Sequence, residues 1–275
     1  MSSDPTEFEA SHGSRRWWAP VARAWRLLAT AFSFAVFGLA GLILSVFVLP
    51  FVWLLVHPAS RRAAVGRRIV GWAFYFFVQL MRFTGCLRYR IRGLEHRADT
   101  RRTLIVANHP SLIDVVFLLA LFRHSDCVVK ASHWKNPCMM MVLRTAGFIP
   151  NSDPGELMAE CIARLKTGAT IVLFPEGTRT EPGEPPVVSR GAATIAVRAQ
   201  ARCLPVRLRC TPTTLTKSER WYDIPPGRVM FEVDVLAPID SAEFLTRCDS
   251  ERQAAIAMHK RLFKTLFTPL AKPDR

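Results

Sequence analysis

The sequence has 275 residues, enough for one domain of ordinary size together with a membrane segment. Half of the residues are hydrophobic, yet lysine and arginine (37) outnumber aspartate and glutamate (22), which gives a net charge of +15. A nucleic-acid binder of this charge should show a zinc-finger or recognition-helix pattern, or basic residues interleaved with exposed aromatics. The sequence has neither, so nucleic acid is not an expected partner.

The N-terminal part contains a long uncharged stretch. Leu27–Val56 carries no charged residue over about 30 positions, whereas a membrane-spanning helix needs about 20. Pro50 divides this stretch unevenly. The aromatic-rich segment Ile69–Phe83 is shorter and is interrupted by Gln79 and Arg82, which indicates an interfacial helix or a short return leg.

Arginines cluster at the ends of these apolar stretches. They are Arg15, Arg16, Arg23 and Arg26 before the first stretch, and Arg61, Arg62, Arg67 and Arg68 between the two. The positive-inside rule then favours a structure that enters the membrane and returns on one side, although a single crossing stays open. A cleaved signal peptide would have an apolar region about half as long. A buried hairpin of a soluble protein, the other alternative, would show a regular polar face.

The seven cysteines are scattered along the chain and include no C-x-x-C pair. They therefore suggest neither a disulfide framework nor a zinc site. Several lie in apolar runs, where a free cysteine behaves as a small buried hydrophobe, and this favours a reducing compartment. We expect the folded domain to face the cytoplasm. The chain is divided into a basic segment (1–26), membrane-embedded or interfacial helices (27–83) and a folded domain (84–275).

From residue 84 onward, short apolar runs alternate with amphipathic stretches, which is typical of an α/β domain. The expected strands are Leu87–Ile91, Thr103–Ala107, Cys127–Lys130, Thr170–Phe174, Leu204–Leu208 and Val229–Val235. The expected helices are Leu112–Phe122, Pro154–Lys166, Gly191–Gln200 and a helical region at Ala242–Phe267. The helix at Pro154 has the strongest start signal, because Asp153 can cap it and Glu156 follows in its first turn.

A histidine follows the second expected strand, and an acid begins the next helix. In the stretch Val-Ala-Asn-His-Pro-Ser-Leu-Ile-Asp, these residues are His109 and Asp114. Open α/β sheets bind ligands at the carboxyl edge of their strands, where this turn would lie. The carboxylate can fix the tautomer of the ring and stabilise the imidazolium. Taken alone, the pair is more typical of a helix cap or a surface pair.

A second motif lies after another expected buried strand. Leu-Phe-Pro-Glu-Gly-Thr-Arg, ending at Arg179, places an acid, a glycine, a hydroxyl and a guanidinium in one turn. Such a set is suited to holding a polyol or an anionic head group. The alternative is a plain strand-ending turn with Glu176 and Arg179 solvated.

The two motifs, in this order, resemble the glycerolipid acyltransferase family, in which the first block (NHxxxxD, or HX4D) is catalytic. The resemblance covers roughly Leu87–Pro238. It implies an α/β fold, a mixed and mostly parallel sheet flanked by helices, behind an N-terminal hydrophobic membrane-anchoring helical segment. It also implies that the catalytic pair is His109 and Asp114, and that the acceptor-binding residues are Glu176, Gly177, Thr178 and Arg179.

Three weaker blocks agree with the resemblance. Lys130 is similar to a family lysine near the acceptor phosphate, and Arg190 begins a segment similar to the glycine block after the Glu-Gly loop. The strand Leu204–Leu208 is similar to one that supports the acyl channel. One block departs from the pattern, because Asn151 stands where many relatives have an arginine that meets the acceptor phosphate.

The resemblance implies attack of an acceptor hydroxyl on the thioester of acyl-CoA or acyl-carrier protein, with His109 as base and Asp114 orienting it. No metal or cofactor is expected, and a covalent route through Ser111 would lack a separate base. The leading acceptor is 1-acylglycerol 3-phosphate, giving phosphatidic acid in phospholipid biosynthesis. The alternatives are another lyso-lipid, a specialised lipid acceptor, or a non-catalytic membrane lipid-binding protein. The expected location is the bacterial inner (cytoplasmic) membrane, with the domain on the cytoplasmic side.

Overall fold

The computed structural model describes residues 19–97 and 100–268, so most of the predicted basic segment, including Arg15 and Arg16, lies outside the described residues. Its centre is an eight-stranded sheet with the order β1-β7-β6-β2-β5-β3-β4, and β8 pairs with β6. All neighbours are parallel except β6 with β7 and β6 with β8. The strands are β1 (Leu87–Arg92), β2 (Thr103–Ala107), β3 (Asp126–Lys130), β4 (Ile149–Asn151), β5 (Thr170–Leu173), β6 (Arg202–Thr211), β7 (Val229–Val235) and β8 (Ile239–Asp240).

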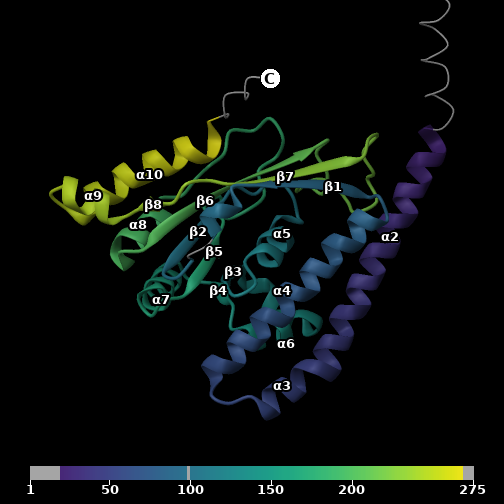
Figure 1. The fold of residues 1–275 in the computed structure, drawn as a ribbon, viewed down its shortest axis with the longest axis horizontal. Coiled ribbons are helices and arrows are strands. Elements are labelled where there is room, and N and C mark those ends of the chain that lie inside the picture. Colours follow the sequence, from purple (N-terminus) through teal and green to yellow (C-terminus); the bar gives the residue numbers. More distant parts are fainter. Residues whose placement is uncertain (1–18, 98–99, 269–275) are drawn as a thin grey trace, which may run out of the picture.

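Helices cover both faces of this sheet (Figure 1). They are α2 (Ala19–Ile43), α3 (Leu49–Leu55), α4 (Ala59–Phe83), α5 (Asp114–Leu121), α6 (Pro137–Ala146), α7 (Pro154–Lys166), α8 (Gly191–Ala199), α9 (Ala242–Arg247) and α10 (Glu251–Phe267). Short 3-10 turns lie at Leu94–Arg97 and Ala131–Lys135. The mixed, mostly parallel sheet flanked by helices confirms the predicted fold class.

Two apolar cores lie on the two sides of the sheet, because successive residues of a strand point to opposite faces. In β2, Ile105 packs with α4, α5 and α6, whereas Leu104 and Val106 pack with α7, α8 and α10. All five residues of β2 are buried, which places it at the centre of the domain. The ends of β2 and β5 thus lie next to each other at the carboxyl edge of the sheet.

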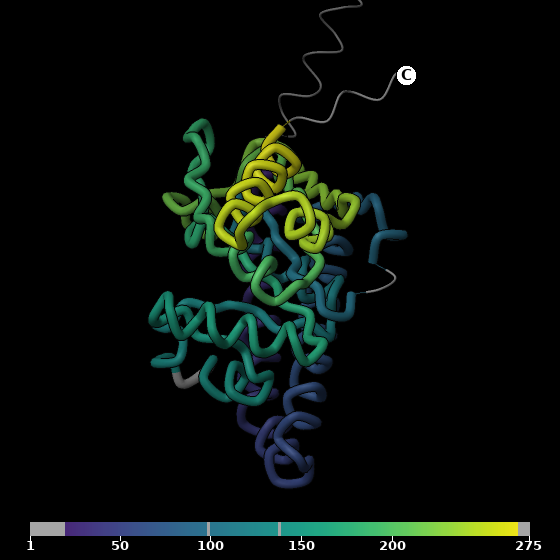
Figure 2. The backbone as a smooth tube through the Cα atoms, turned by 90° about the vertical axis from the view of Figure 1, so that its left-hand side faces the viewer, coloured from purple at the N-terminus to yellow at the C-terminus, as the bar shows by residue number. Residues whose placement is uncertain are grey.

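The N-terminal helices form an apolar hairpin that extends beyond the sheet (Figure 2). The helical stretch Pro20–Leu55 is 36 residues long and has a mean hydropathy of 2.5 in its most apolar window, of which only 17% is buried. It is long and apolar enough to cross a membrane, which agrees with the predicted anchoring segment. A π-helical turn at Leu44–Val48 precedes Pro50, which lacks the N–H that a regular helix would use there.

Helix α4 belongs to the hairpin and to the domain at once. Its buried residues Val70, Phe77 and Met81 join the core beneath β1, β6 and β7. Gly66 lies so close to α6 that a Cβ added there would stand 2.6 Å from the carbonyl oxygen of Thr145. The predicted segment Ile69–Phe83 is therefore the second part of a longer helix, one face of which is packed on α5 and α6.

Arginines lie over tryptophan rings at two places, one near the tip of the hairpin at Trp53 and one further along α4 at Trp72. The guanidinium of Arg62 lies 3.8 Å from the ring centroid of Trp53, and that of Arg123 lies 3.9 Å from the ring centroid of Trp72. Tryptophan and arginine together are typical of the interfacial zone of a bilayer, where one end of the group is apolar and the other is wet.

Two parts of the chain differ from the sequence-based expectation. The helical region Ala242–Phe267 is two helices, because Ser250 leaves the helical conformation and caps α10, accepting a hydrogen bond from the N–H of Gln253 at 3.3 Å. Helix α6 and the short strand β4 were not predicted at all. They fill the interval between β3 and α7 and pair β4 with β3.

Candidate active site

The two motifs that follow β2 and β5 meet at the carboxyl edge of the sheet, because these strands are parallel neighbours. His109 lies two residues beyond the end of β2, and Asp114 begins α5. The Nδ1 atom of His109 is 2.8 Å from Oδ2 of Asp114. The same carboxylate oxygen accepts the N–H of Ser111 at 2.7 Å, so the turn wraps around the acid.

The histidine ring is held on a second side by an aromatic ring. His109 stacks on Phe174, which directly follows β5, with the ring centroids 4.3 Å apart and the planes at 26°. The side chain of His109 is 16% exposed, whereas that of Asp114 is fully buried. A small opening therefore leads to the ring, while its partner acid is sealed from solvent.

Glu176 fixes the backbone on which His109 lies. Its Oε1 accepts the N–H of His109 at 2.8 Å, and its Oε2 accepts the hydroxyl of Thr180. The N–H of Thr180 in turn donates to the carbonyl of His109 at 3.1 Å. The Glu-Gly loop and the histidine turn are thus one hydrogen-bonded unit, and the carboxylate of Glu176 is occupied within the protein.

Burial changes the titration of both acids. It raises the pKa of Asp114 to about 6, against the opposing effects of the hydrogen bond to His109 and of the N–H of Ser111. It also raises the pKa of Glu176, which the hydrogen bond from the N–H of His109 partly offsets. A buried carboxylate at the end of an imidazole is the arrangement that stabilises an imidazolium.

Arg179 is near this pair but is partly engaged elsewhere. Its Nη1 donates to the carbonyl oxygens of Leu215 at 2.9 Å and Thr216 at 2.7 Å. Its Nε and Nη2 have no hydrogen-bond partner in the described part of the chain, and its charge lowers the pKa of Asp114. Gly177 has a positive φ of +70°, which suits glycine, and Thr178 is exposed beside it.

Lys130 and Arg190, the other two predicted binding residues, do not contact the pair. Lys130 ends β3 and is exposed, and its register partner on β4 is Asn151, which is also exposed. Arg190 precedes α8 and lines a cleft between α7, α8 and α10. No hydrogen bond or ion pair in the described residues joins Lys130 or Arg190 to His109 or Asp114.

A long connection between β6 and β7 packs against the histidine turn. This connection, Pro212–Arg228, touches the histidine turn twice: the N–H of Leu112 donates to the carbonyl of Leu215 at 3.0 Å, and the hydroxyl of Ser111 donates to that of Thr214 at 2.9 Å. Ser111 is buried by this contact, so its hydroxyl is not directed at a substrate. At the other end of the connection, Arg26 of α2 donates a hydrogen bond to the carbonyl of Pro226 at 2.9 Å.

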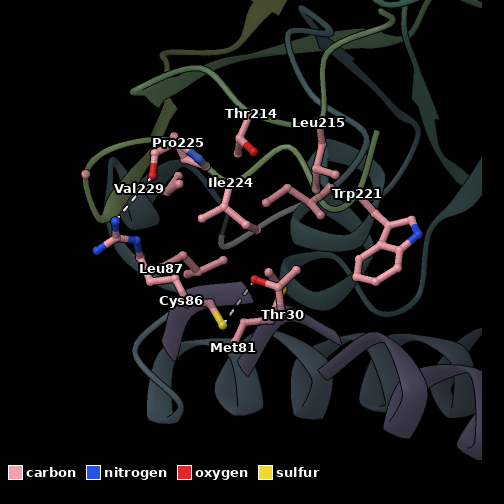
Figure 3. A pocket seen from close by; sticks show the side chains of 13 residues that line it. Thr30, Met81, Cys86, Leu87, Thr214, Leu215, Trp221, Ile224, Pro225 and Val229 are labelled. Atoms are coloured by element: carbon pink, nitrogen blue, oxygen red, sulfur yellow. Dashed lines mark hydrogen bonds between the residues drawn. The ribbon is translucent and has the colours of Figure 1, made fainter. Parts of the chain in front are cut away.

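A narrow apolar pocket of about 30 Å³ lies where this connection meets α2, α4 and α5 (Figure 3). In the close-up, Leu87, Leu215, Trp221 and Ile224 surround it, and Thr30 donates to the thiol of Cys86 at its floor. The pocket also touches Ile113, the neighbour of Asp114. A pocket of this volume has room for about one water molecule.

Several residues that build the site carried no recognised sequence signal. Asn108 bridges β2 and β6 with its amide: Nδ2 donates to the carbonyl of Leu208 at 2.9 Å, and Oδ1 accepts the N–H of Leu208 at 2.7 Å. In the sequence, the clue to the role of Asn108 was its position directly before His109. Phe174, Thr180 and Leu215 become visible as site residues only once the loops are folded together.

The chain is similar to known acyltransferases over the part that carries the site. The Acyltransferase family model matches residues 88–209. A mouse 1-acyl-sn-glycerol-3-phosphate acyltransferase alpha is 30% identical over 193 residues, covering 67% of this chain and 65% of the mouse protein. A Pseudomonas aeruginosa 1-acyl-sn-glycerol-3-phosphate acyltransferase is 31% identical over 138 residues, covering 48% of this chain and 53% of that protein.

The chain spans a smaller part of some relatives than of others. The chloroplastic 1-acyl-sn-glycerol-3-phosphate acyltransferase of Arabidopsis thaliana is 28% identical over 130 residues, covering 45% of this chain and only 36% of the plant protein. Among solved structures, the 1-acyl-sn-glycerophosphate acyltransferase PlsC from Thermotoga maritima superimposes with a TM-score of 0.62. That match covers 92% of this chain and all of the other at 20% identity, so it bears on the fold.

Proposed function

Because this chain belongs to the glycerolipid acyltransferase family, we propose that it transfers a fatty acyl group from a thioester to the hydroxyl of a lyso-lipid. The observation that carries the proposal is the 2.8 Å contact between Nδ1 of His109 and the buried carboxylate of Asp114. An ionised carboxylate only accepts hydrogen bonds, so Nδ1 carries the proton and Nε2 is left free to accept one.

The reaction follows from this tautomer. Nε2 of His109 takes the proton of the acceptor hydroxyl as its oxygen bonds to the thioester carbonyl carbon, and Asp114 stabilises the imidazolium that forms. The tetrahedral adduct then collapses, the carbon–sulfur bond breaks, and the imidazolium returns the proton to the leaving thiolate. Ser111 cannot act as a nucleophile in this arrangement, because its hydroxyl is buried against Thr214.

The leading acceptor is 1-acylglycerol 3-phosphate, and the product is then phosphatidic acid. Arg179 supports this choice, because two of its three nitrogens remain available beside His109 and a guanidinium binds phosphate well. Lys130 on the neighbouring flank adds a second positive charge. The N–H groups of His109, Ser111 and Leu112 are occupied within the protein, so they do not serve an oxyanion.

A second acceptor class is favoured by one residue. Asn151 is the register partner of Lys130 at the carboxyl edge of the sheet, where an arginine would make a bidentate phosphate contact. An amide offers a hydrogen bond without charge, which suits a phosphate-free lyso-lipid. The choice between the two acceptors is a matter for experiment.

We place the protein at the bacterial inner membrane, with the domain on the cytoplasmic side. The apolar helix Pro20–Leu55, the arginines at the tip of the hairpin and the free buried cysteines of the described chain support this position. The lipid acceptor then approaches from the bilayer, and the acyl donor approaches from the cytoplasm.

The test supplies purified protein in vesicles with radiolabelled acyl-CoA or acyl-carrier protein, and offers lysophosphatidic acid beside phosphate-free lyso-lipids. Label that enters phosphatidic acid, and that is lost in His109→Ala, supports the reaction and the phosphate acceptor together. Transfer only to a phosphate-free acceptor keeps the reaction and changes the acceptor. Absence of transfer from either donor to every acceptor would refute the enzyme and leave a lipid-binding protein.

A further inference from the structure

A second concave site lies outside the His109 centre, along the helices of the opposite core. This cleft has a volume of about 450 Å³ and runs between α7, α8 and α10, which Figure 1 shows side by side. Ligand pockets for small molecules typically have about 300–1,000 Å³. Its lining includes Met158, Arg190, Thr194, Arg198, Arg252 and Ile256.

The charge of the cleft is positive. Three arginines line it against a single acid, Glu251, whose carboxylate lies 3.8 Å from Nε of Arg198. The guanidinium groups of Arg190 and Arg252 make no hydrogen bond or ion pair with any residue in the described part of the chain. Arg190 is also close enough to α10 for its charge to lower the pKa of His259, after the larger effect of burial. Two guanidinium groups therefore stand uncommitted in one concave site.

The cleft begins next to the histidine turn. The N–H of Ser189, the residue before Arg190, donates to the carbonyl of Pro175 at 2.9 Å. Pro175 precedes Glu176, whose carboxylate holds the backbone of His109 at 2.8 Å. From Arg190 the cleft follows α8 to Arg198, a rise of about 12 Å at 1.5 Å per residue. A ligand bound there can extend one end toward His109.

We propose that this cleft binds the phosphorylated nucleotide end of a coenzyme A thioester, the acyl donor, and this inference rests on the proposed acyl transfer. Arg190 and Arg252 bind phosphate groups, and the aliphatic Met158 and Ile256 pack against the adenine ring. The pantetheine arm then leads past Ser189 to the thioester beside His109. Guanidinium groups suit this role because their planar donors fit phosphate oxygens in pairs.

The shape of the site favours a nucleotide over a carrier protein. A carrier protein is a folded macromolecule that would meet this face across a broad and mostly flat contact. The observed cleft is concave and is lined by apolar side chains together with the exposed arginines Arg190 and Arg252, which matches a compact ligand with several phosphates. Carrier-protein recognition is thus the competing outcome of the test.

Binding of coenzyme A itself, without acyl group or acceptor, is measured first by titration calorimetry on the full-length protein in detergent. Arg252→Glu reverses one charge of the cleft at the second position of α10, where an acidic residue is compatible with the helix start. Arg261→Glu is the matched control, because nine residues further along the helix it lies on the opposite side. We expect Arg252→Glu to weaken binding about tenfold or more at low salt, and Arg261→Glu to change it less than twofold.

The kinetic arm compares acyl-CoA with an acyl-pantetheine thioester, which has the same reacting group and no phosphates. Wild-type protein should prefer acyl-CoA, and Arg252→Glu should lower kcat/KM for acyl-CoA about tenfold while leaving that for acyl-pantetheine and the KM for the lyso-lipid unchanged. Equal use of the two donors by wild-type protein would overturn the inference, and so would transfer from acyl-carrier protein without binding of coenzyme A.

If the proposed acyl transfer is wrong, the experiments give a different result from the one expected if the coenzyme A site is wrong. If coenzyme A binds and Arg252→Glu weakens that binding, while no acceptor receives an acyl group, the cleft stands as a nucleotide site and the acyltransferase is refuted. If acyl transfer occurs but neither arginine variant alters the affinity for coenzyme A, the reaction stands and the cleft is refuted as its donor site.

Discussion

Nη1 of Arg179 donates to the carbonyl oxygen of Leu215 at 2.9 Å, and the same carbonyl accepts the N–H of Leu112 in the histidine turn. One atom of the Pro212–Arg228 connection thus joins the Glu-Gly loop to the turn that carries His109. Arg26 of α2 holds the far end of this connection. Helix α2 and the turn that carries His109 are thus linked through a single segment.

Arg179→Lys tests this link. A lysine keeps the charge but replaces three planar nitrogens by a single ammonium, which cannot hold the two carbonyl oxygens and also form a bidentate contact with a phosphate, so kcat/KM should fall about 10–100-fold. The expected cause is displacement of the connection, and limited proteolysis should therefore cut Pro212–Arg228 faster in the variant. Lys217→Arg, an exposed change on the same connection, is the control. An active and protease-resistant Arg179→Lys protein would contradict the link.

His109→Ala should remove the chemistry and leave the fold. General base catalysis contributes about 10²–10⁴-fold, so kcat should fall by at least that factor. The ring is at the edge of the core and its loss uncovers one face of Phe174, so the melting temperature should change little. His124→Ala changes an exposed histidine and is the control for the effect of a histidine-to-alanine change on activity and melting temperature. Activity retained within tenfold would remove His109 from the mechanism.

Activity should depend on pH through Asp114. The carboxyl has a pKa of about 6, above its ordinary value near 4, because it is buried. As the pH falls through about 6, the protonated acid no longer accepts from Nδ1 of His109 and kcat/KM should drop. The pH–rate profile checks this, and a flat profile between pH 5 and 8 would exclude a role for the Asp114 carboxylate.

The same burial has a stability consequence with a defined sign. Because the folded-state pKa lies above the unfolded value, the folded protein binds more protons between about pH 4 and 6, and its stability falls as pH rises through that window. Above about pH 6 the buried carboxylate of Asp114 is ionised. The raised pKa then lowers the free energy of unfolding by about 3 kcal/mol. Urea unfolding should show Asp114→Asn gaining stability relative to wild type from pH 4 to pH 7. A constant difference would contradict the raised pKa.

Asn151→Arg should change the acceptor preference. An arginine beside Lys130 supplies a bidentate phosphate partner, so the KM for 1-acylglycerol 3-phosphate should fall about tenfold. The KM for a phosphate-free lyso-lipid should stay the same or rise. Asn151→Gln keeps the amide and controls for side-chain length. If both acceptors respond equally to Asn151→Arg, this position does not select the head group.

Salt should weaken the attachment to anionic lipid. Arg61 and Arg62 lie in the first turn of α4, at the tip of the hairpin, and Arg62 lies over the ring of Trp53; each positive charge near an anionic surface contributes about 1 kcal/mol. Activity on anionic vesicles should therefore decrease as salt increases, and activity on neutral vesicles should not. Turnover on anionic vesicles that is insensitive to salt would mean that these arginines only set the topology.

Strong local signals in the sequence were sufficient to predict the spans of the central strands and of one helix. The spans of β2, β7 and α7 follow the sequence prediction to the residue, because β2 is buried throughout, β7 alternates strongly and Asp153 caps α7. The cap is observed, with Oδ1 of Asp153 accepting the N–H groups of Gly155 at 2.8 Å and Glu156 at 2.9 Å. The pairing of His109 with Asp114 is likewise present as the motif predicts.

Other elements depend on partners that are distant in sequence. β6 is twice as long as predicted, because charges that would interrupt an isolated strand are matched by other strands and helices. Arg209 pairs with Asp234 of β7 at 2.9 Å, and Arg207 donates to the carbonyl of Leu266 at the end of α10. The three-residue strand β4 has too few positions to show a period. Its pairing with β3 comes from the parallel fold.

The dual character of α4 decides how the molecule can be divided. Because Val70, Phe77 and Met81 complete the core under β1, β6 and β7, a soluble fragment that begins at residue 84 would lack one wall of that core. Hydrophobic side chains of β1, α5 and β7 would then be uncovered, and such a fragment would aggregate. The anchoring helices are therefore a permanent part of the folded unit, and proteolysis between them and the domain would unfold the domain without releasing it.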